Sequence, residues 1–379
     1  TICGARLGAA SSADPAYDPK RTRLAMLQEK LTPPETKAHV SVARLRRFWY
    51  VACQSSELGT KPLARSVVGV PLVIFRGADG QAAAVLDRCP HRNVPLSLGR
   101  VVAGGRLECA YHGWQFEPGG RCALVPGLLA PDARERRVSS AAVREQGGFV
   151  WVYPELDVMP EAPPFELPQA LPEYARVVRE VETDATLHAT IENALDVPHT
   201  AFLHRGLFRG GKRNEIKATV RREADRVEVR YDGEPRPSGI AGRVLSPGGG
   251  TVEHWDRFIL PSIAQVEYRL GADVHFLVTS LCTPVTDFRT RMFAQVQFKT
   301  RFPARAVQRL LEPFALRIFG QDAQMLRAQA ENIRRFGGEQ FMSTELDFLG
   351  PHIWRLLKQA EQGEPSGDAV VERAVTFLA

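Results

Sequence analysis

The chain has 379 residues and no long apolar run. Its longest such stretch, Val68–Phe75, is interrupted by Pro71 and is far shorter than the roughly 18 to 20 residues that cross a bilayer. We therefore expect no transmembrane segment. Basic residues form no block either, because the net charge of +6 comes from scattered arginines. This pattern gives no sign of nucleic-acid binding and agrees with an ordinary charged surface or with an acidic protein partner.

Cysteine is scarce, and its six positions are too uneven for a disulfide framework. We expect a reducing, cytoplasmic setting. The sequence also lacks a fingerprint for flavin or nicotinamide, since the triple glycine at 248–250 is not followed by helical sequence. The cysteines expected to be buried small side chains or inert thiols are Cys3, Cys53, Cys122 and Cys282.

Length and composition indicate a globular protein of two domains. Hydrophobic residues make up 44% and charged residues 24% of the chain, which is ordinary for a globular protein. We expect an N-terminal tail at 1–36, a β domain at 37–155, a proline-rich linker at 156–175 and a mixed domain at 176–379.

Short β-rich segments between glycines and prolines predict antiparallel strands in the first domain. They lie at 48–53, 67–75, 82–86 and 148–152. In the second domain we expect strands at 177–183, 217–231, 252–260, 264–270, 275–282 and 290–298. Helical sequence follows at 304–336, with an interruption near Gly320, and at 351–362.

The first domain carries two cysteine–histidine pairs. One is Cys89-Pro-His91, and the other, after seventeen intervening residues, is Cys109-Ala-Tyr-His112. Two thiolates and two imidazoles can bind tetrahedral zinc or a [2Fe-2S] cluster in which histidines replace cysteines on one iron. Because each loop supplies one sulfur and one nitrogen, the arrangement favours the cluster, with zinc as the alternative.

Early in the second domain, the stretch from Glu192 to His204 supplies two imidazoles and a nearby carboxylate. Two histidines and one carboxylate form the facial triad of non-heme Fe(II) oxygenases. On a straight helix Asp196 and His199 share a face, whereas His199 and His204 do not. Both histidines can reach one ion only if the helix bends or ends nearby, and Pro198 gives a reason for that.

The runs Cys-Pro-His-Arg-Asn-Val-Pro-Leu at 89–96 and Cys-Ala-Tyr-His-Gly-Trp at 109–114 resemble the Rieske motif of the Rieske non-heme iron oxygenases. The resemblance covers the chain after about residue 37. It implies an α+β protein with an N-terminal all-β Rieske [2Fe-2S] domain and a helix-grip (START-like) catalytic domain built on an antiparallel sheet. The implied cluster ligands are Cys89, His91, Cys109 and His112.

The same resemblance implies that His199 and His204 bind a mononuclear Fe(II) together with a late carboxylate. Asp322, in Phe-Gly-Gln-Asp-Ala-Gln-Met-Leu, matches that residue and is expected to open a helix. A helix N-cap is the alternative role for this residue. The competing carboxylates are Glu331, Glu345 and Asp347.

Asp196 matches the family aspartate that links the two metal centres. In that family the molecules form homotrimers, so Asp196 would hydrogen-bond His199 of its own chain and a Rieske histidine, His112, of the next. A solvated helix carboxylate is the alternative. Asn193 matches a position near the iron, with a helix-surface amide as its alternative. The histidines expected to be satisfied or at the surface are His39, His188, His254, His275 and His352.

The resemblance implies a terminal oxygenase that uses O2 and electrons from a ferredoxin, an NAD(P)H-dependent reductase or both. It would hydroxylate or oxidatively demethylate its substrate, and we favour a large hydrophobic, sterol-like molecule. An aromatic or arylamine oxygenase is the alternative, followed by an electron carrier or lipid-binding protein without oxygenase activity. Candidate cavity residues are Phe202, Leu207, Phe208, Ile240, Leu260, Val266, Tyr268, Phe276 and Met325.

Overall fold

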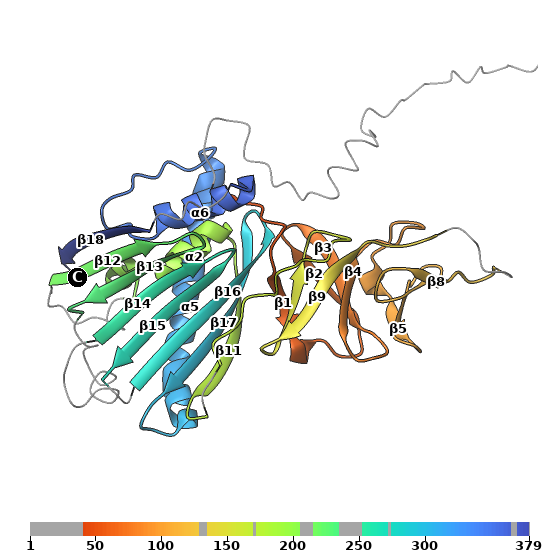
Figure 1. The fold of residues 1–379 in the computed structure, drawn as a ribbon, viewed down its shortest axis with the longest axis horizontal. Coiled ribbons are helices and arrows are strands. Elements are labelled where there is room, and N and C mark those ends of the chain that lie inside the picture. The colour runs from red at the N-terminus through yellow and green to blue at the C-terminus, as the bar shows by residue number, and fades with distance from the viewer. Residues whose placement is uncertain are drawn as a thin grey trace, which may run out of the picture.

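The N-terminal part of the chain folds into strands and two short 3-10 helices (Figure 1). Its six-stranded sheet has the order β1-β10-β9-β4-β3-β2 and its four-stranded sheet the order β5-β6-β7-β8. The first sheet contains β1 (Tyr50–Gln54), β2 (Leu63–Val67), β3 (Val70–Arg76), β4 (Ala82–Leu86), β9 (Ser140–Gln146) and β10 (Phe149–Tyr153). The second contains β5 (Arg100–Val102), β6 (Arg106–Glu108), β7 (Gln115–Phe116) and β8 (Cys122–Leu124), and the 3-10 helices are η1 (Ser55–Glu57) and η2 (Leu96–Leu98).

The computed structural model describes residues 41–128, 135–169, 172–204, 215–234, 252–271, 274–364 and 370–378. Several sequence-based expectations lie outside these ranges. They are the tail at 1–36, Cys3, His39 and the candidate cavity residues Leu207, Phe208 and Ile240. Among the described helices, none combines the length and the apolar character needed to cross a bilayer.

The C-terminal part is an eight-stranded antiparallel sheet of order β11-β17-β16-β15-β14-β13-β12-β18. Its strands are β11 (Ala175–Thr183), β12 (Glu215–Arg222), β13 (Arg226–Asp232), β14 (Val252–Ile259), β15 (Ile263–Leu270), β16 (Val274–Thr286), β17 (Arg289–Lys299) and β18 (Val371–Leu378). The helices are α2 (Leu187–Leu195), α3 (Val197–Leu203), α5 (Ala304–Arg335) and α6 (Gly350–Gln362). The expected fold class, an all-β domain followed by an antiparallel sheet with few helices, is confirmed.

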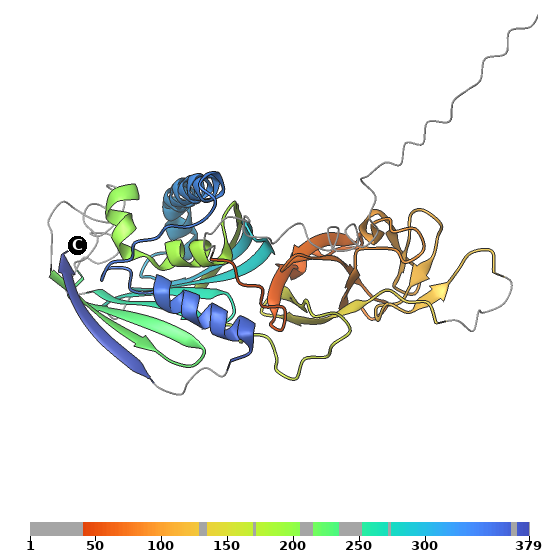
Figure 2. The same cartoon turned by 90° about the horizontal axis from the view of Figure 1, so that it is seen from above.

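The helices lie on one side of the eight-stranded sheet, as Figure 2 shows. Side chains alternate between the two faces of a strand, so the register determines which residues meet the helices. Phe258 and Ala264 are cross-strand partners, and both pack in one buried cluster with Leu187 of α2 and Ile353 of α6. We call this helix-covered side the inner face.

The two parts of the chain share a hydrophobic core. Trp151 and Phe149 of β10 belong to the same buried cluster as Leu281 of β16 and Phe293 of β17. The rings of Phe149 and Phe293 meet edge to face, with centroids 5.9 Å apart. Such aromatic pairs add to the free energy gained by burying their apolar area. The six-stranded and eight-stranded sheets are therefore joined by packing as well as by the chain between β10 and β11.

Three local expectations are wrong. Helix α5 runs unbroken through Gly320, because the buried residues Leu326, Ala330 and Ile333 hold this part of the helix against the protein despite the glycine. The segment expected as one strand at 217–231 forms two strands, β12 and β13, which turn between Arg222 and Arg226. The last strand of the sheet, β18, has no counterpart among the expected elements.

Candidate functional site

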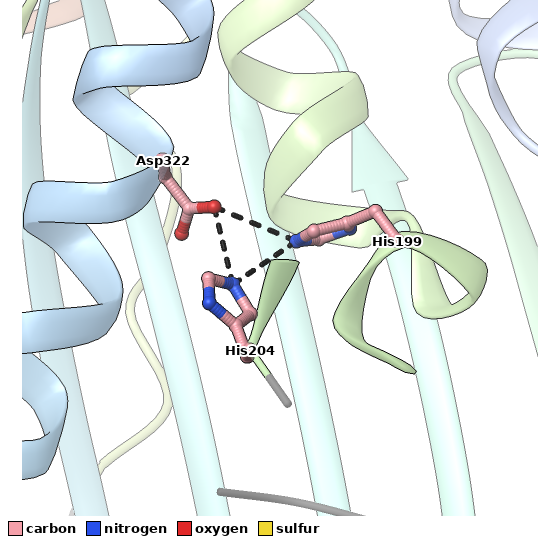
Figure 3. A group of neighbouring side chains, drawn as sticks. All are labelled: His199, His204 and Asp322. Carbon is pink, nitrogen blue, oxygen red and sulfur yellow. Dashed lines mark hydrogen bonds and ion pairs between the residues drawn. The ribbon is translucent and has the colours of Figure 1, made fainter. Parts of the chain in front are cut away.

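His199, His204 and Asp322 converge on one point (Figure 3). The two Nε2 atoms are 3.2 Å apart, and Asp322 Oδ1 lies 3.5 Å from His199 Nε2 and 3.2 Å from His204 Nε2. Three ligands at about 2.1 Å from a metal in mutually adjacent octahedral positions would be separated by about 3 Å. The three donor atoms therefore outline one face of a coordination sphere and leave the opposite side open.

The chain between α2 and α3 brings the two histidines together. Asp196 ends α2 and precedes α3 with an extended backbone, φ −88° and ψ 103°. Pro198 follows in the first turn of α3, where no backbone N–H is needed for the helix. His204 is the residue after α3 and is not helical, with φ −106° and ψ 38°. The break expected from the five-residue spacing of His199 and His204 is therefore present.

Asp322 comes from α5, in the interior of the helix. The expectation that it opens a helix is wrong, and the N-cap role falls with it. Leu326, one turn later, is buried with Ala185 and Ala189 at the start of α2. Residues four apart share one helix face, so this packing directs Asp322 toward the α2–α3 segment. Among the described residues, the competing carboxylates Glu331, Glu345 and Asp347 do not join the group.

Gln321 holds the second nitrogen of His204 and was missed by the sequence analysis. Its Oε1 lies 3.0 Å from His204 Nδ1. Because an amide oxygen only accepts hydrogen bonds, Nδ1 must carry the hydrogen. The Nε2 lone pair of His204 is then free to face the open point between the three ligands. The only sequence signal for this role is the position of Gln321 next to the matched aspartate.

Asp196 and Asn193 both lie beside the triad. Asp196 Oδ2 is 3.3 Å from His199 Nδ1, without the alignment of a normal hydrogen bond. Burial lowers the pKa of His199, but Asp196 and Asp322 outweigh it and raise that pKa to about 9. The side-chain amide of Asn193 donates to Asp322 Oδ1 over 3.4 Å. Both residues therefore contact ligands of the proposed iron rather than solvent alone.

The chemistry of this donor set fits Fe(II). Two imidazole nitrogens and one carboxylate oxygen match the non-heme iron triad, and each side chain is at most 20% exposed. The two carboxylates that raise the pKa of His199 would be balanced by a bound cation.

The two cysteine–histidine loops share the same pattern of backbone hydrogen bonds. Cys89 N–H donates to Val94 O, and Cys109 N–H donates to Trp114 O. In each loop the residue four positions after the cysteine has a positive φ, 62° at Asn93 and 68° at Gly113, and donates its N–H to the cysteine carbonyl. In the first loop, the backbone N–H groups of His91 and Arg92 also contact the Cys89 thiol.

The cysteine side chains of the two loops are buried more deeply than the histidine side chains. Cys89 and Cys109 are 1% and 2% exposed, and their thiols contact each other. Burial is the main reason why the pKa of Cys89 is raised. His91 and His112 lie nearer the surface with ring centroids 4.6 Å apart, and buried His91 Nδ1 has no hydrogen-bond partner. This arrangement fits a [2Fe-2S] cluster with sulfur ligands on an inner iron and nitrogen ligands on an outer iron.

The remaining cysteines and histidines have ordinary surroundings. Cys53 and Cys282 are buried, Cys122 is partly buried, and all described cysteines are free thiols. The other described histidines are His188, which bonds Gly350 O, His254 and His275, which contact carboxylates, and the half-buried His352.

The candidate cavity residues divide into two groups. Val266, Tyr268 and Phe276 are half-buried on the inner face of the sheet. Leu260 is also half-buried and packs against the large cluster that includes α2. Phe202 and Met325 are exposed by 71% and 54%. A cavity wall built from the sheet residues therefore agrees better with the structure than one built from Phe202 and Met325.

Comparisons with known proteins support both a Rieske cluster and a mononuclear iron centre. Residues 48–135 match the Rieske [2Fe-2S] domain, and residues 183–362 match the vanillate O-demethylase oxygenase C-terminal domain. The chain is 28% identical to the vanillate O-demethylase oxygenase subunit of Pseudomonas sp. (strain HR199 / DSM 7063) over 358 residues, which cover 87% of this chain and 99% of that one. It is 34% identical to the dicamba O-demethylase oxygenase component of Stenotrophomonas maltophilia over 42% of this chain and 48% of the relative.

A solved structure shows the same architecture. The crystal structure of dicamba monooxygenase bound to 3,6-dichlorosalicylic acid superposes with a TM-score of 0.72 at 25% identity. The superposition covers 85% of this chain and 98% of that one. A further dicamba monooxygenase structure contains the non-heme iron, at 24% identity and a TM-score of 0.66.

Proposed function

Because the chain belongs to the Rieske non-heme iron oxygenases as a terminal oxygenase subunit, we propose that it oxidatively demethylates or hydroxylates an aromatic substrate. The convergence of His199, His204 and Asp322 carries this proposal. Vanillate and dicamba, in the names of two relatives, support a methoxy-aromatic compound. A sterol-like substrate, expected from the sequence, receives no support from these names.

We propose that the two metal centres have separate roles in separate parts of the chain. We assign the [2Fe-2S] cluster to residues 37–155, with Cys89, His91, Cys109 and His112 as ligands, and iron chemistry to residues 176–379, with 156–175 as the linker. When bound, the mononuclear iron supplies the binding and reductive activation of O2 beside the substrate.

The side chains around the triad orient its ligands. Gln321 keeps the hydrogen of His204 on Nδ1, so that Nε2 faces the metal. Asp196 faces His199 Nδ1 and favours the hydrogen on that nitrogen. Asn193 donates its amide to Asp322 and restrains the carboxylate. These contacts hold the ligand atoms in place before the metal arrives, which raises metal affinity.

Electrons come from outside the chain, as in other Rieske oxygenases, and we propose a ferredoxin, an NAD(P)H-dependent reductase or both as the donor. We place this exchange in the cytoplasm, where the free cysteines of the described residues would stay reduced.

We further propose a homotrimer in which the cluster of one chain serves the iron of the next. In Figure 1, the sheet that contains β5 and β8 lies at the end of the molecule away from the eight-stranded sheet. The cluster loops connect strands in this part of the molecule, whereas the triad comes from α5 and from the segment of α3, which pack with the eight-stranded sheet. His112 is exposed and the side chain of Asp196 is 36% exposed, so the two can meet across a contact between chains.

The test is the metal content of the purified protein, reduced anaerobically and examined by EPR. We expect about three irons and two acid-labile sulfides per chain, with the spectrum of a reduced Rieske cluster. His199→Ala should lose one iron and keep the cluster spectrum, whereas His352→Ala on α6 should keep all three. Zinc without sulfide would contradict both assignments.

Activity is then measured with a ferredoxin–reductase pair and methoxy-aromatic compounds, as formaldehyde released per O2 consumed. Formaldehyde from the parent protein and none from His199→Ala would support demethylation at the triad. Hydroxylation of a sterol without any formaldehyde from methoxy-aromatic compounds would restore the substrate expected from the sequence.

A further inference from the structure

The two proposed histidine ligands of the cluster have different aromatic neighbours. His91 stacks in parallel on the indole of Trp114, with ring centroids 4.8 Å apart and 8° between the ring planes. His112 instead contacts the ring of Tyr111, with centroids 3.9 Å apart and 46° between the planes. Tyr111 and His112 are exposed, whereas His91 and Trp114 are half-buried. The loops therefore present two different edges, one formed by His91 with Trp114 and one formed by His112 with Tyr111.

Three segments of the chain meet at Trp114. The indole belongs to the second loop, and its stacking partner His91 belongs to the first. The third segment supplies Arg136, whose guanidinium carbon lies 5.8 Å from the centroid of the Trp114 ring. A guanidinium is attracted to the face of an indole. The backbone of this arginine is fixed as well, because its carbonyl accepts the N–H of Cys122 at 2.8 Å. These contacts place a positive charge beside the His91 edge.

The surface around this edge is positively charged. The two loops, residues 88–98 and 109–116, contain no aspartate or glutamate but carry Arg88 and Arg92. With Arg136 and the glutamate that precedes it, the net charge is +2 when the histidines are neutral. Arg92 is exposed. Within the described part of the chain, neither Arg88 nor Arg92 forms an ion pair, so these charges are available to a partner.

The carboxylates that flank the two loops are bonded to other groups. Asp87, just before the first loop, accepts the backbone N–H of Ser97 at 2.7 Å and its hydroxyl at 2.6 Å. The other two form ion pairs with arginines outside the loops, Glu108 with Arg100 at 2.8 Å and Glu117 with Arg121 at 2.6 Å. These acidic groups are therefore held away from the arginines of the loops.

Exposed apolar side chains lie next to the same loops. Tyr111 is 62% exposed and Leu98 is 71% exposed. A side-chain carbon at Gly113 would lie 3.1 Å from Pro126, so the segment that contains the half-exposed Leu128 passes close to the second loop. Arginine and aromatic residues are enriched where proteins bind one another. The composition of this region therefore fits a surface that docks a protein.

We propose that Arg92, Trp114 and Arg136 form the docking surface for an acidic one-electron carrier protein of the ferredoxin class, and we call it the donor surface. The positive charge attracts and orients a partner of opposite charge. The electron enters at the His91 edge, which leaves the His112 edge for the neighbouring chain. The carrier loses one electron, the cluster gains it, and no bond forms or breaks. This inference rests on the proposed function, specifically on the Rieske cluster and its external donor.

The first test is binding of an oxidised, acidic plant-type [2Fe-2S] ferredoxin to the full chain with its metals, measured by calorimetry. No electron transfer is needed for this measurement. We expect the affinity to fall about tenfold between about 20 mM and about 200 mM NaCl, because salt screens attraction between exposed charges. Binding that is independent of salt would contradict a docking surface that depends on charge.

Charge-reversal variants locate the surface. Arg92→Glu and Arg136→Glu should each weaken ferredoxin binding at low salt by at least about tenfold. Lys217→Glu changes the net charge equally but lies exposed on β12, far from β5 and β8 in Figure 1, and should bind as the parent protein does. An equal loss in all three variants would mean that only the overall charge matters. If Arg136→Glu fails to retain its cluster, Arg92→Glu alone decides.

Light scattering distinguishes a donor from a second copy of this chain as the partner. Arg92→Glu should keep the oligomeric state of the parent protein. If the variant instead dissociates the assembly while its affinity for ferredoxin is unchanged, the surface is a contact between copies and the proposal is wrong.

Stopped-flow absorbance then separates entry of the electron from its later use. A plant-type ferredoxin has a lower reduction potential than a cluster with two histidine ligands, so transfer to the cluster is favourable. Reduction of the cluster by reduced ferredoxin should be about tenfold slower in Arg92→Glu at low salt, whereas reduction by dithionite should be unchanged. Slower reduction by both reagents would assign Arg92 to the cluster environment rather than to docking.

A single turnover distinguishes this proposal from the proposed function. Protein reduced by dithionite, then freed of reductant, is mixed with O2 and a methoxy-aromatic compound, and Arg92→Glu should release as much formaldehyde as the parent protein. Weakened ferredoxin binding in Arg92→Glu with no formaldehyde from either protein would support the donor surface and reject demethylation. Equal ferredoxin binding with normal formaldehyde release would reject the donor surface and support demethylation.

Discussion

Gln321 and Asp322, neighbours on α5, contact opposite sides of one imidazole. Gln321 Oε1 lies 3.0 Å from His204 Nδ1, and Asp322 Oδ1 lies 3.2 Å from His204 Nε2. One helix segment therefore supplies both a proposed metal ligand and the group that fixes the tautomer of another proposed ligand. Because His204 is only 1% exposed, water cannot readily replace either contact.

Gln321→Leu should weaken binding of the mononuclear iron by about 10- to 100-fold, because the tautomer and orientation of His204 are no longer fixed. The measurement is Fe(II) titration of protein that retains its cluster. Gln324→Leu on the exposed side of the same helix is the matched control. Equal affinities for the two variants would show that Gln321 does not support the ligand.

Asp196→Asn should leave both metals bound but abolish coupled turnover, because the amide cannot act as the negatively charged acceptor between the two centres. Iron and sulfide contents are compared with the rate of substrate oxidation when the donor supplies electrons. Asp232→Asn, an exposed aspartate on β13, should behave as the parent protein. A near-normal rate for Asp196→Asn would reject the bridging role.

Glu192→Gln should make the protein more stable at alkaline pH. Burial, followed by repulsion from Asp196, raises the pKa of Glu192 from its ordinary value of 4.5 to about 7. The carboxyl lies against the start of α6, where a side chain at Gly350 would collide with it. Because the folded state holds this proton more tightly than the unfolded state, stability falls as pH rises from about 4.5 to about 7.

The cost of ionising Glu192 in the folded protein is about 3 kcal/mol at pH 8, and the amide avoids it. Urea unfolding at pH 4 and pH 8 measures the difference. The gain from Glu192→Gln should appear only at the higher pH. A gain of the same size at pH 4 would point to packing rather than ionisation.

Phe293→Ala should destabilise the protein by about 3 to 5 kcal/mol, because it removes a buried ring from the core shared by the two parts of the chain. Unfolding is followed by the visible absorbance of the cluster and by far-UV circular dichroism. Both signals should shift to lower denaturant. A shift in circular dichroism alone would mean that the six-stranded sheet is stable without this contact.

Most of the proposed metal ligands could be picked out from the sequence because their signals are local. The two cysteine–histidine loops each fit within four residues, and their backbone turns are alike. The five-residue spacing of His199 and His204 required a helix break, and the structure has one. The roles of these residues were assigned by resemblance, and Asp322 had no local signal at all, since its helix face is determined by packing of Leu326 against α2.

Contacts between distant segments of the chain could not be predicted from the sequence. Propensity placed a break at Gly320, yet tertiary packing keeps α5 helical through this glycine and through Pro313. Glu234 and His254 are twenty residues apart, and the pairing of β13 with β14 brings them into contact. Sequence periodicity carries no information about such a contact. Nothing in the sequence therefore distinguishes His254 from an ordinary polar residue.

The shared core affects how this enzyme can be recombined with its relatives. A chimera joined within the proposed linker at 156–175 would place Phe149 and Trp151 of one parent against Leu281 and Phe293 of another. The join that looks natural in the sequence therefore divides one packed unit. Exchanging the redox module would succeed best when the catalytic side of that contact is exchanged with it.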